Sequence, residues 1–279
     1  MSGAGVTEDP AAVPVRPAAT VMLVDDRPDL HVLVLRRNAA TIFAGGMWVF
    51  PGGRVDPDDE VVAARVGPSR DERPDAPGAE PVSPAHRVAA VRETFEEAGL
   101  LLARPVSGGG APLEPGPRTG QLRQALNAGE VTFGHVLDEL GLVCDLDAVH
   151  YVSRWVTPQG PPRRFDARFF VARPPVGQRA THDDDEAVAS RWARPHELLA
   201  AFERGEAALM TPTRRMIRSL AAFECADDVV EAARRARAGE IVRSSPDGEG
   251  GWEPLLPGDA GYDVADESIE TGWVRLRLH

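Results

Sequence analysis

The chain has 279 residues, a formal net charge of −12 and a pI near 5.1. This excess of acid argues against a protein that coats nucleic acid or binds an anionic membrane surface. Cys144 and Cys225 are too few for a disulfide framework or a structural zinc site, and no run of about 18 apolar residues is present. We therefore expect a cytoplasmic protein without a nucleic-acid or membrane partner.

The N-terminal segment predicts a leader, a hairpin and a third strand. Met1–Pro17 is rich in small residues and prolines and lacks the basic start and apolar block of a signal peptide, so we expect a flexible leader. Ala18–Val24 and His31–Leu35 are rich in β-forming residues, and the Asp-Asp-Arg-Pro-Asp between them indicates a hairpin. Met47–Phe50 is a third candidate strand.

A proline- and glycine-rich stretch precedes one long helix. Residues 66–84 have a composition that buries little apolar surface, which indicates a surface excursion. A helix is expected over residues 84–102, stopped by Gly99. Residues 103–120 form a second linker, and residues 121–140 predict two short helices.

The second half of the chain mixes strands with helices. Residues 149–157 and 164–172 are expected to pair as strands, with a turn at residues 158–162. This mixture predicts a layered α/β domain. The remaining expected elements are a strand, three helices and an edge strand: 187–193, 196–204, 213–223, 227–238 and the tail from Trp273.

The expected helix over residues 84–102 carries three acids at positions i, i+3 and i+4: Glu93, Glu96 and Glu97. This spacing places them on one helix face, where like charges repel each other. A bound cation would offset the repulsion, and Mg2+ and Mn2+ prefer carboxylate oxygens. The alternative is a solvated acidic face with Arg92 as its ion-pair partner.

Two segments together resemble a known family motif. The run Met47-Trp-Val-Phe-Pro-Gly-Gly53 ends a candidate strand at two glycines, which let the backbone approach a ligand closely. Residues 92–100 read Arg-Glu-Thr-Phe-Glu-Glu-Ala-Gly-Leu. This combination resembles the Nudix box, whose pattern is Gly, five residues, Glu, seven residues and Arg-Glu-U-X-Glu-Glu-X-Gly-U, with U apolar. Thr94 occupies one of the apolar positions.

The first half of the box departs from the family pattern in two ways. After Gly53 and five further residues stands Asp59, where the pattern has Glu, and Glu60 comes one position late. Residues 60–91 number 32 where the pattern has seven, an insertion of 25. The acid that the pattern places before the insertion, here called the loop acid, is therefore Asp59 or Glu60. The insertion occupies about residues 60–84.

The resemblance implies a fold and a reaction. The fold would be an α/β/α sandwich with a mixed β-sheet over residues 18–222, followed by a C-terminal extension over residues 223–279. The reaction would be hydrolysis of a diphosphate linkage in a nucleoside diphosphate derivative, a small-molecule partner, with Mg2+ or Mn2+ as cofactor. A non-catalytic Nudix-like module that binds a nucleotide is the alternative of a different class, and a homodimer is left open.

Residue-by-residue transfer of the family pattern assigns roles within the box. The metal ligands would be the backbone carbonyl of Gly52 and the helix acids Glu93, Glu96 and Glu97, of which Glu96 and Glu97 also count as catalytic. Arg92 would tie the loop acid to the helix so that Glu93 points correctly, as a contact behind the metal ligands. Gly53 would support the loop.

Residues outside the box are further candidates. In this family a general base often comes from a later loop, and Glu186 is chosen because the Trp-Ala-Arg-Pro-His-Glu-Leu run after it resembles the family's closing strand and helix. His182 is the other candidate base. Arg36 and Arg37 follow a strand and Arg164 opens another, where arginine suits oxyanion contact, although a strand-end cation is also an ordinary feature.

Three features resemble one subgroup, the Nudix proteins related to peroxisomal coenzyme A diphosphatases, which carry an interrupted box. They are the run Phe43-Ala-Gly-Gly-Met-Trp-Val-Phe-Pro-Gly-Gly53, the insertion, and Arg154-Trp-Val-Thr-Pro followed by Arg163-Arg-Phe-Asp-Ala-Arg-Phe-Phe. This resemblance implies cleavage of coenzyme A or acyl-coenzyme A into phosphopantetheine and adenosine 3',5'-bisphosphate. Nucleotide sugars, dinucleoside polyphosphates and NADH are the alternative substrates.

Overall fold

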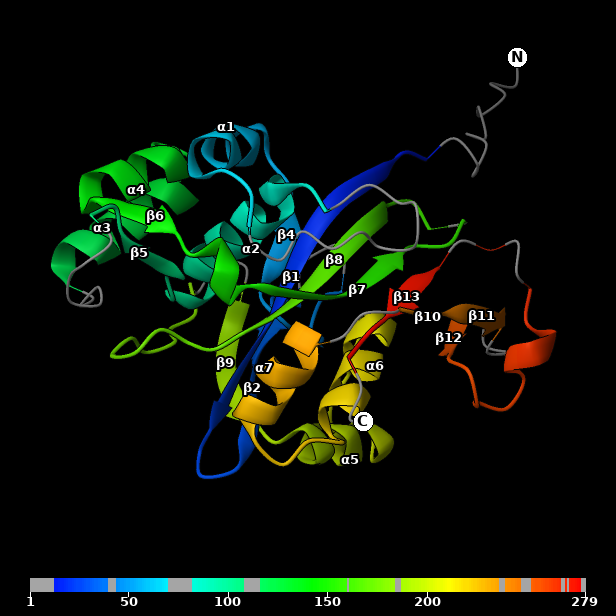
Figure 1. The fold of residues 1–279 in the computed structure, drawn as a ribbon. Helices are drawn as coiled ribbons and strands as arrows, with labels where there is room; N and C mark the ends of the chain where they lie inside the picture. The colour runs from blue at the N-terminus through cyan, green and yellow to red at the C-terminus, as the bar shows by residue number, and fades with distance from the viewer. Residues whose placement is uncertain are drawn as a thin grey trace, which may run out of the picture.

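The computed structural model (Figure 1) describes most of the chain. The described residues are 13–39, 44–69, 82–107, 116–159, 161–183, 187–235, 239–246, 252–266, 269 and 271–276. In this part of the chain no helix combines the length and apolar character that crossing a membrane requires.

A nine-stranded mixed sheet forms the centre of the fold. Its order is β10-β13-β7-β8-β1-β2-β3, with β4 also paired to β1 and β9 to β2. β1 runs parallel to β8, whereas β1–β2 and β7–β8 are antiparallel. The strands are β1 (Val15–Asp26), β2 (Leu30–Arg37), β3 (Trp48–Val49), β4 (Gly52–Arg54), β7 (His150–Val156), β8 (Arg164–Ala172), β9 (Ala187–Ala193), β10 (Glu240–Ile241) and β13 (Gly272–Val274).

Helices cover both faces of this sheet, which confirms the expected α/β/α sandwich (Figure 1). Helices α1–α4 share one hydrophobic core and helices α5–α7 share the other. The helices are α1 (Pro57–Val66), α2 (Pro84–Ala98), α3 (Pro117–Asn127), α4 (Phe133–Leu140), α5 (Pro195–Glu203), α6 (Thr211–Leu220) and α7 (Ala226–Arg235).

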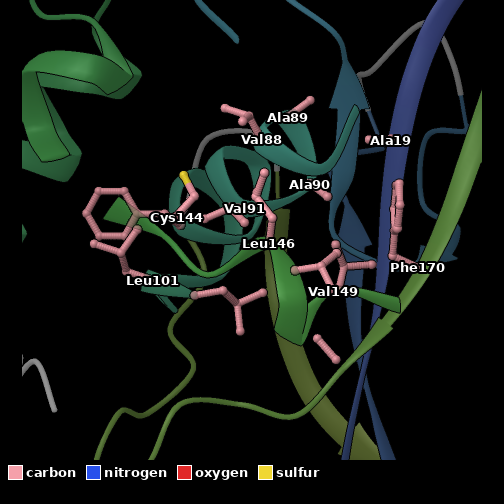
Figure 2. Packing of buried hydrophobic residues seen from close by; sticks show 14 of the residues in the cluster. Ala19, Val88, Ala89, Ala90, Val91, Leu101, Cys144, Leu146, Val149 and Phe170 are labelled. Atoms are coloured by element: carbon pink, nitrogen blue, oxygen red, sulfur yellow. The ribbon is translucent and has the colours of Figure 1, made fainter. Parts of the chain in front are cut away.

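Alternation along the central strand divides the two cores. Val21 and Leu23 of β1 face the core with α2, whereas Met22 and Val24 face the core with α5–α7. All four side chains have no exposed surface. Successive side chains in a strand point to opposite faces, so a run of consecutive apolar residues marks a strand buried on both sides. Figure 2 shows the first core, where apolar residues of α2 lie beside residues of β1 and β8.

Helix α2 is bounded by local signals at both ends. The Ser83 side chain accepts a hydrogen bond from the N–H of Ala85 at 3.3 Å, and Pro84 occupies the first turn. Gly99 adopts a left-handed conformation with φ of 68°, which ends the helix. The expected helix over residues 84–102 is therefore four residues too long, because the left-handed glycine cannot continue the helix.

Two N-terminal expectations also need correction. Strand β1 begins at Val15, so the last three residues of the expected leader pair with β8. Residues 57–66, where no helix was expected, form α1 after an Asp-Pro start, and the N–H of Asp56 donates to the Asp59 carboxylate at 2.8 Å. Most of the expected excursion, residues 70–81, lies outside the described residues.

The segment after residue 222 continues the main sheet and the second core. β13 pairs with both β7 and β10, so it is an inner strand and not the expected edge strand. Val229 and Ala233 of α7 are fully buried in the core with α5 and α6. Three further pieces complete the fold: the β11 (Arg243–Pro246) and β12 (Trp252–Leu255) hairpin, the β5 (Ala103–Pro105) and β6 (Leu142–Cys144) pair, and 3-10 turns at Leu146–Ala148 and Tyr262–Val264.

The second expected linker is shorter than predicted, because residues 103–105 form β5 and α3 begins at residue 117. The two short helices within residues 121–140 are confirmed as α3 and α4. The hairpin of β1 and β2, the paired strands β7 and β8, strand β9 and the three helices that follow are also confirmed, with small shifts at their ends.

Candidate active site

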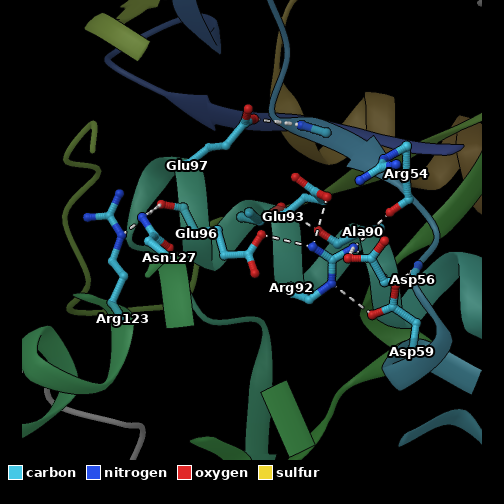
Figure 3. Close-up of polar contacts among 12 residues, drawn as sticks. Arg54, Asp56, Asp59, Ala90, Arg92, Glu93, Glu96, Glu97, Arg123 and Asn127 are labelled. Atoms are coloured by element: carbon cyan, nitrogen blue, oxygen red, sulfur yellow. Dashed lines mark hydrogen bonds and ion pairs between the residues drawn. The ribbon is translucent and has the colours of Figure 1, made fainter. Parts of the chain in front are cut away.

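Strand β4 and the C-terminal half of α2 lie against each other, residue by residue (Figure 3). The N–H of Gly52 donates to Glu97 Oε2 at 2.8 Å. The carbonyl of Arg54 accepts a hydrogen bond from Arg92 Nη2 at 2.8 Å. The strand residues thus meet helix residues spaced by about one turn, so the two halves of the sequence motif form one site.

The two glycines of β4 are required by close approach. A Cβ atom on Gly53 would lie 2.6 Å from the carboxylate carbon of Glu93. A Cβ atom on Gly52 would lie 2.7 Å from the backbone Cα of Thr20 on the neighbouring strand. Both distances are too short for real atoms, so any larger residue would displace either the Glu93 carboxylate or the sheet. Gly53 therefore leaves room for the Glu93 carboxylate and Gly52 leaves room for strand β1, and we call this pair the glycine cradle.

Arg92 links the loop acid, the strand and the helix acids. Its Nε and Nη2 donate to Asp59 at 2.9 and 3.0 Å, and its Nη1 donates to Glu93 and Glu96, both at 2.8 Å. The Arg92 side chain is 6% exposed. Burial opposes its charge, but the hydrogen bonds and charges of these carboxylates outweigh burial, and the pKa of Arg92 is raised. Arg92 is thus held as a cation at the centre of the acids.

The structure resolves the choice between Asp59 and Glu60. Asp59 has no exposed surface and accepts both Arg92 hydrogen bonds, whereas Glu60 is exposed on α1. Asp59 is the third helical residue of α1, which directs its side chain back toward the N–H of Asp56 and toward Arg92. The loop-acid position therefore belongs to Asp59, and Glu60 makes no contact with Arg92 among the described interactions.

The helix acids are shielded from solvent to different degrees. The side chains of Glu93, Glu96 and Glu97 are 12%, 20% and 5% exposed. Burial raises the pKa of Glu96, although the charge and hydrogen bond of Arg92 oppose that rise. An acid that burial makes costly to ionise gains more from a nearby cation than an exposed acid does.

The donor set fits a hard divalent cation. Carboxylate oxygens from one helix face lie beside a glycine cradle that leaves no room for a side chain. Such oxygen ligands suit Mg2+ and Mn2+ and do not suit softer metals. Among the described residues, no three Asp, Glu, His or Cys side chains are already grouped tightly enough to enclose an ion. Glu93 and Glu96 each have one oxygen engaged by Arg92.

The candidate substrate arginines are distributed over the sheet, and only one lies near the acids. Arg37 Nη1 is 4.0 Å from Glu97 Oε1. Arg36 is exposed, and its Nε contacts the carbonyl of Gly46 at 3.4 Å. Adjacent strand residues face opposite sides of the sheet, which is why the pair separates.

Arg164 does not reach the site. It donates to the carbonyl of Thr157 at 3.0 Å and pairs in register with Val15. The register of β1 places Gly52 beside Thr20, five residues further along the strand, which is roughly 16 Å away. Arg164 therefore stabilises the turn between β7 and β8.

The loop between β8 and β9 approaches the end of α2. The N–H of Thr181 donates to the carbonyl of Ala98 at 2.9 Å. His182 Nδ1 lies 3.3 Å from Ser190 Oγ, and Asp183 accepts a hydrogen bond from the N–H of Ala187 at 2.9 Å. Glu186, the chosen base, lies outside the described residues.

Two further site features have little or no sequence signal. The Gly52 N–H donates to Glu97, a contact that the sequence did not predict. The expected role of the Gly52 carbonyl as a metal ligand stays a prediction. Arg123 of α3 donates from Nε to the carbonyl of Glu96 at 2.9 Å. No local pattern singles out Arg123, because α3 is separated in sequence from both segments that it joins.

Comparisons with known proteins agree with this geometry. The family model of the NUDT19 Nudix domain matches residues 61–219. The chain is 32% identical to the human acyl-coenzyme A diphosphatase NUDT19 over 86% of this chain and 74% of that protein. It is 29% identical to the chicken protein of the same name over 88% of this chain and 79% of that one. A NUDIX hydrolase crystal structure from Alicyclobacillus acidocaldarius is 30% identical, with a TM-score of 0.64 over 76% of this chain and 93% of that chain.

Proposed function

Because this chain belongs to the Nudix hydrolase family, in the group with the NUDT19 Nudix domain, we propose that it cleaves the diphosphate bridge of coenzyme A or an acyl-coenzyme A. The products would be adenosine 3',5'-bisphosphate and phosphopantetheine or its acyl form. The chain is a pyrophosphohydrolase of the Nudix type, and enzymes of this family need a divalent metal. The substrate and the choice between Mg2+ and Mn2+ are the proposed parts.

The similarity to two acyl-coenzyme A diphosphatases, over a site with the Nudix acids in place, carries the proposal. The Arg92 network and the glycine cradle give the Nudix reaction its acids, and similarity to two acyl-coenzyme A diphosphatases extends over more than four fifths of the chain. The similarity therefore includes elements on both sides of the box. The interrupted box, with its 25-residue insertion, is one of the three sequence features that resemble this substrate group.

The residues of the chain divide the work in the following way. A bound divalent cation would offset the charge of the diphosphate and lower the pKa of an attacking water. Glu93, Glu96 and Glu97 would hold it, and Glu97 is fixed in direction by the N–H of Gly52. Arg92 fixes the directions of the Glu93 and Glu96 side chains through one hydrogen bond to each carboxylate. Arg37, beside Glu97, is placed to contact a substrate phosphate.

A loop residue would accept the proton of the attacking water. The loop between β8 and β9 leads from Thr181, which is bonded to the end of α2, toward Glu186. Glu186 is the proposed base, with His182 as the second candidate from the same loop. Replacement of Glu186 by Gln should then lower kcat with a smaller effect on metal binding than loss of a helix acid.

A product-resolved assay tests the proposal. Purified protein with Mg2+ or Mn2+ is incubated with coenzyme A, acyl-coenzyme A, ADP-ribose, NADH, a nucleotide sugar and a diadenosine polyphosphate, and products are identified by mass spectrometry. We expect adenosine 3',5'-bisphosphate from the coenzyme A compounds at the highest kcat/KM. Faster cleavage of any other compound would assign the site to that substrate instead.

Glu97→Gln is the matched control for this assay. The amide oxygen of Gln can still accept the hydrogen bond from Gly52, so the fold should be retained, while the charge needed to hold a cation is lost. We expect turnover to fall by at least about 100-fold with an unchanged circular dichroism spectrum. Full activity in the variant would contradict the metal-ligand assignment.

A further inference from the structure

Helix α2 carries its acids at the unfavourable end. Glu93, Glu96 and Glu97 lie in the last two turns, and the last turn of α2 contains no basic residue. The C-terminal end of a helix is the negative end of its dipole, where carboxylates are disfavoured and cations are stabilising. Arg92 contacts Glu93 and Glu96 from within the helix, and a positive group at the open carbonyls of the last turn would stabilise this end further.

Arg123 of α3 supplies that group (Figure 3). Its Nε donates to the carbonyl of Glu96 at 2.9 Å, which satisfies one of the carbonyls left open at the helix end. Asn127, one turn further along α3, donates to the same carbonyl at 3.3 Å. The neighbouring Leu122 and Leu126 are buried in the first core, so the backbone that carries Arg123 is fixed by apolar packing.

The other two nitrogens of the same guanidinium hold the loop between β8 and β9. Nη1 donates to the hydroxyl of Thr181 and Nη2 to its carbonyl, both at 2.9 Å. The N–H of Thr181 in turn donates to the carbonyl of Ala98 at 2.9 Å. Thr181 is thus held on three atoms, two by Arg123 and one by the end of α2.

Two neighbouring contacts confine the loop further. The side chain of Gln178 exchanges hydrogen bonds with the backbone of Leu101, accepting at 2.8 Å and donating at 3.3 Å. A Cβ atom on Gly99 would lie 2.7 Å from the Thr181 hydroxyl and 2.9 Å from Arg123 Nη1. Gly99 therefore serves two purposes, because it ends the helix and leaves the space that this contact fills.

We propose that Arg123 is a positioning residue, which locks the loop between β8 and β9 onto the end of the carboxylate helix. His182 and Asp183 follow Thr181 directly, and Arg123 supplies two of the three hydrogen bonds that fix Thr181 relative to the end of α2. A catalytic group that is displaced by about 1 Å loses up to about 100-fold in rate. The inference rests on the proposed function only for its catalytic consequence, because the loop contact itself can be measured without substrate.

The test compares Arg123→Ala and Arg123→Lys with Arg118→Ala. Arg118 lies on the same helix, is 59% exposed and pairs at the surface with Glu139, so its loss controls for helix α3. Hydrogen–deuterium exchange of peptides covering residues 178–183 gives the readout without substrate. We expect faster exchange in Arg123→Ala and unchanged exchange in Arg118→Ala.

Steady-state kinetics give the second readout. Arg123→Ala should lower kcat by about 10- to 100-fold with KM changed less than about twofold, because the guanidinium is engaged by Glu96 and Thr181. Arg123→Lys should recover only part of kcat, because one ammonium cannot replace a fork that reaches both Thr181 and Glu96. Unchanged exchange of the loop in Arg123→Ala, or a kcat equal to that of Arg118→Ala, would overturn the inference.

The outcomes also separate the two proposals. If the wild-type protein hydrolyses none of the diphosphate compounds, but Arg123→Ala still accelerates exchange of the loop, the contact stands and the proposed function fails. If the enzyme is active and full activity returns in Arg123→Lys, charge alone is sufficient and the positioning role is refuted.

Discussion

The contact between Asp59 and Arg92 offers the sharpest test of the site. Asp59→Asn keeps the size of the side chain but removes its charge. Asp59 Oδ1 accepts from Arg92 Nε at 2.9 Å, and Oδ2 accepts from Arg92 Nη2 at 3.0 Å and from the N–H of Asp56 at 2.8 Å. Whichever way the new amide is turned, its NH2 group faces a donor. At least one hydrogen bond to a buried cation is therefore lost.

The size of the effect follows from these bonds. A hydrogen bond to a charged group is worth about 1.5–3 kcal/mol, and removing one partner of a buried ion pair costs about 3–5 kcal/mol. Arg92 keeps its contacts with Glu93, Glu96 and the Arg54 carbonyl, so the lower part of this range applies. We expect a loss of about 2–3 kcal/mol, which corresponds to a fall in Tm of about 3–5 °C for a chain of 279 residues.

The assay is chemical denaturation of Asp59→Asn beside Glu60→Gln, its exposed neighbour. Glu60→Gln should change the free energy of unfolding by less than about 0.5 kcal/mol, as surface substitutions usually do. Asp59→Asn should also lower kcat, because Arg92 would no longer be held in the position that directs Glu93. Equal effects of the two substitutions, or a larger effect of Glu60→Gln, would refute the assignment of the loop acid.

Three other outcomes are expected. Gly53→Ala should lower kcat about 10- to 100-fold by displacing the Glu93 carboxylate, whereas Gly120→Ala, which has open space around it, should leave kcat unchanged in the same assay. Burial lowers the pKa of His86 to about 4 from 6.5, so the unfolded chain takes up a proton in this pH range before the folded protein does. The stability that comes from burying neutral His86 is therefore complete above pH 6.5 and is lost as pH falls toward 4. His86→Gln should flatten that part of a curve of unfolding free energy against pH, and an unchanged slope would refute it. Trp273→Ala should lower the free energy of unfolding by about 3–5 kcal/mol, because Trp273 is 6% exposed within the main sheet. Urea unfolding should remain a single transition, and an early separate transition would show an independent C-terminal unit.

The strands were predictable where their pattern is strong and local. The β1–β2 hairpin has buried runs on either side of an Asp- and Pro-containing turn, and β7 and β8 have similar runs. Helix α1 was missed because only Asp59, Val62 and Ala63 of its ten residues are buried, so it shows little apolar periodicity. Its Asp-Pro start followed by acids is a helix N-terminus signal that could have identified it.

The inner position of β13 could not be read from the sequence. Its outer partner β10 has only two residues, Glu240–Ile241, which is too short to show any alternation. An inner strand with apolar alternation looks the same as an edge strand until its neighbours are known. The role of a strand within a sheet depends on its partners, and those are distant in the sequence.

The acids of the site were predictable from their spacing, but their partners were not. Glu93, Glu96 and Glu97 share a helix face in any α-helix, so the sequence placed them together. The choice of Asp59 over Glu60 depends on how α1 is oriented against α2, and Arg123 comes from a third helix. Contacts between elements carry no local periodicity, which is why these two residues required the structure.

Apolar packing on the opposite face of α2 explains how three acids are held so close together. Val88, Val91 and Phe95 follow helical spacing on the core side and are at most 1% exposed. A rotation of α2 that relieved the crowding of its carboxylates would expose these side chains, at about 1.5–3 kcal/mol each. Hydrogen bonds from Arg92 to Glu93 and Glu96 offset part of the repulsion among the acids. The apolar core and Arg92 together therefore hold the acids of α2 beside the glycine cradle.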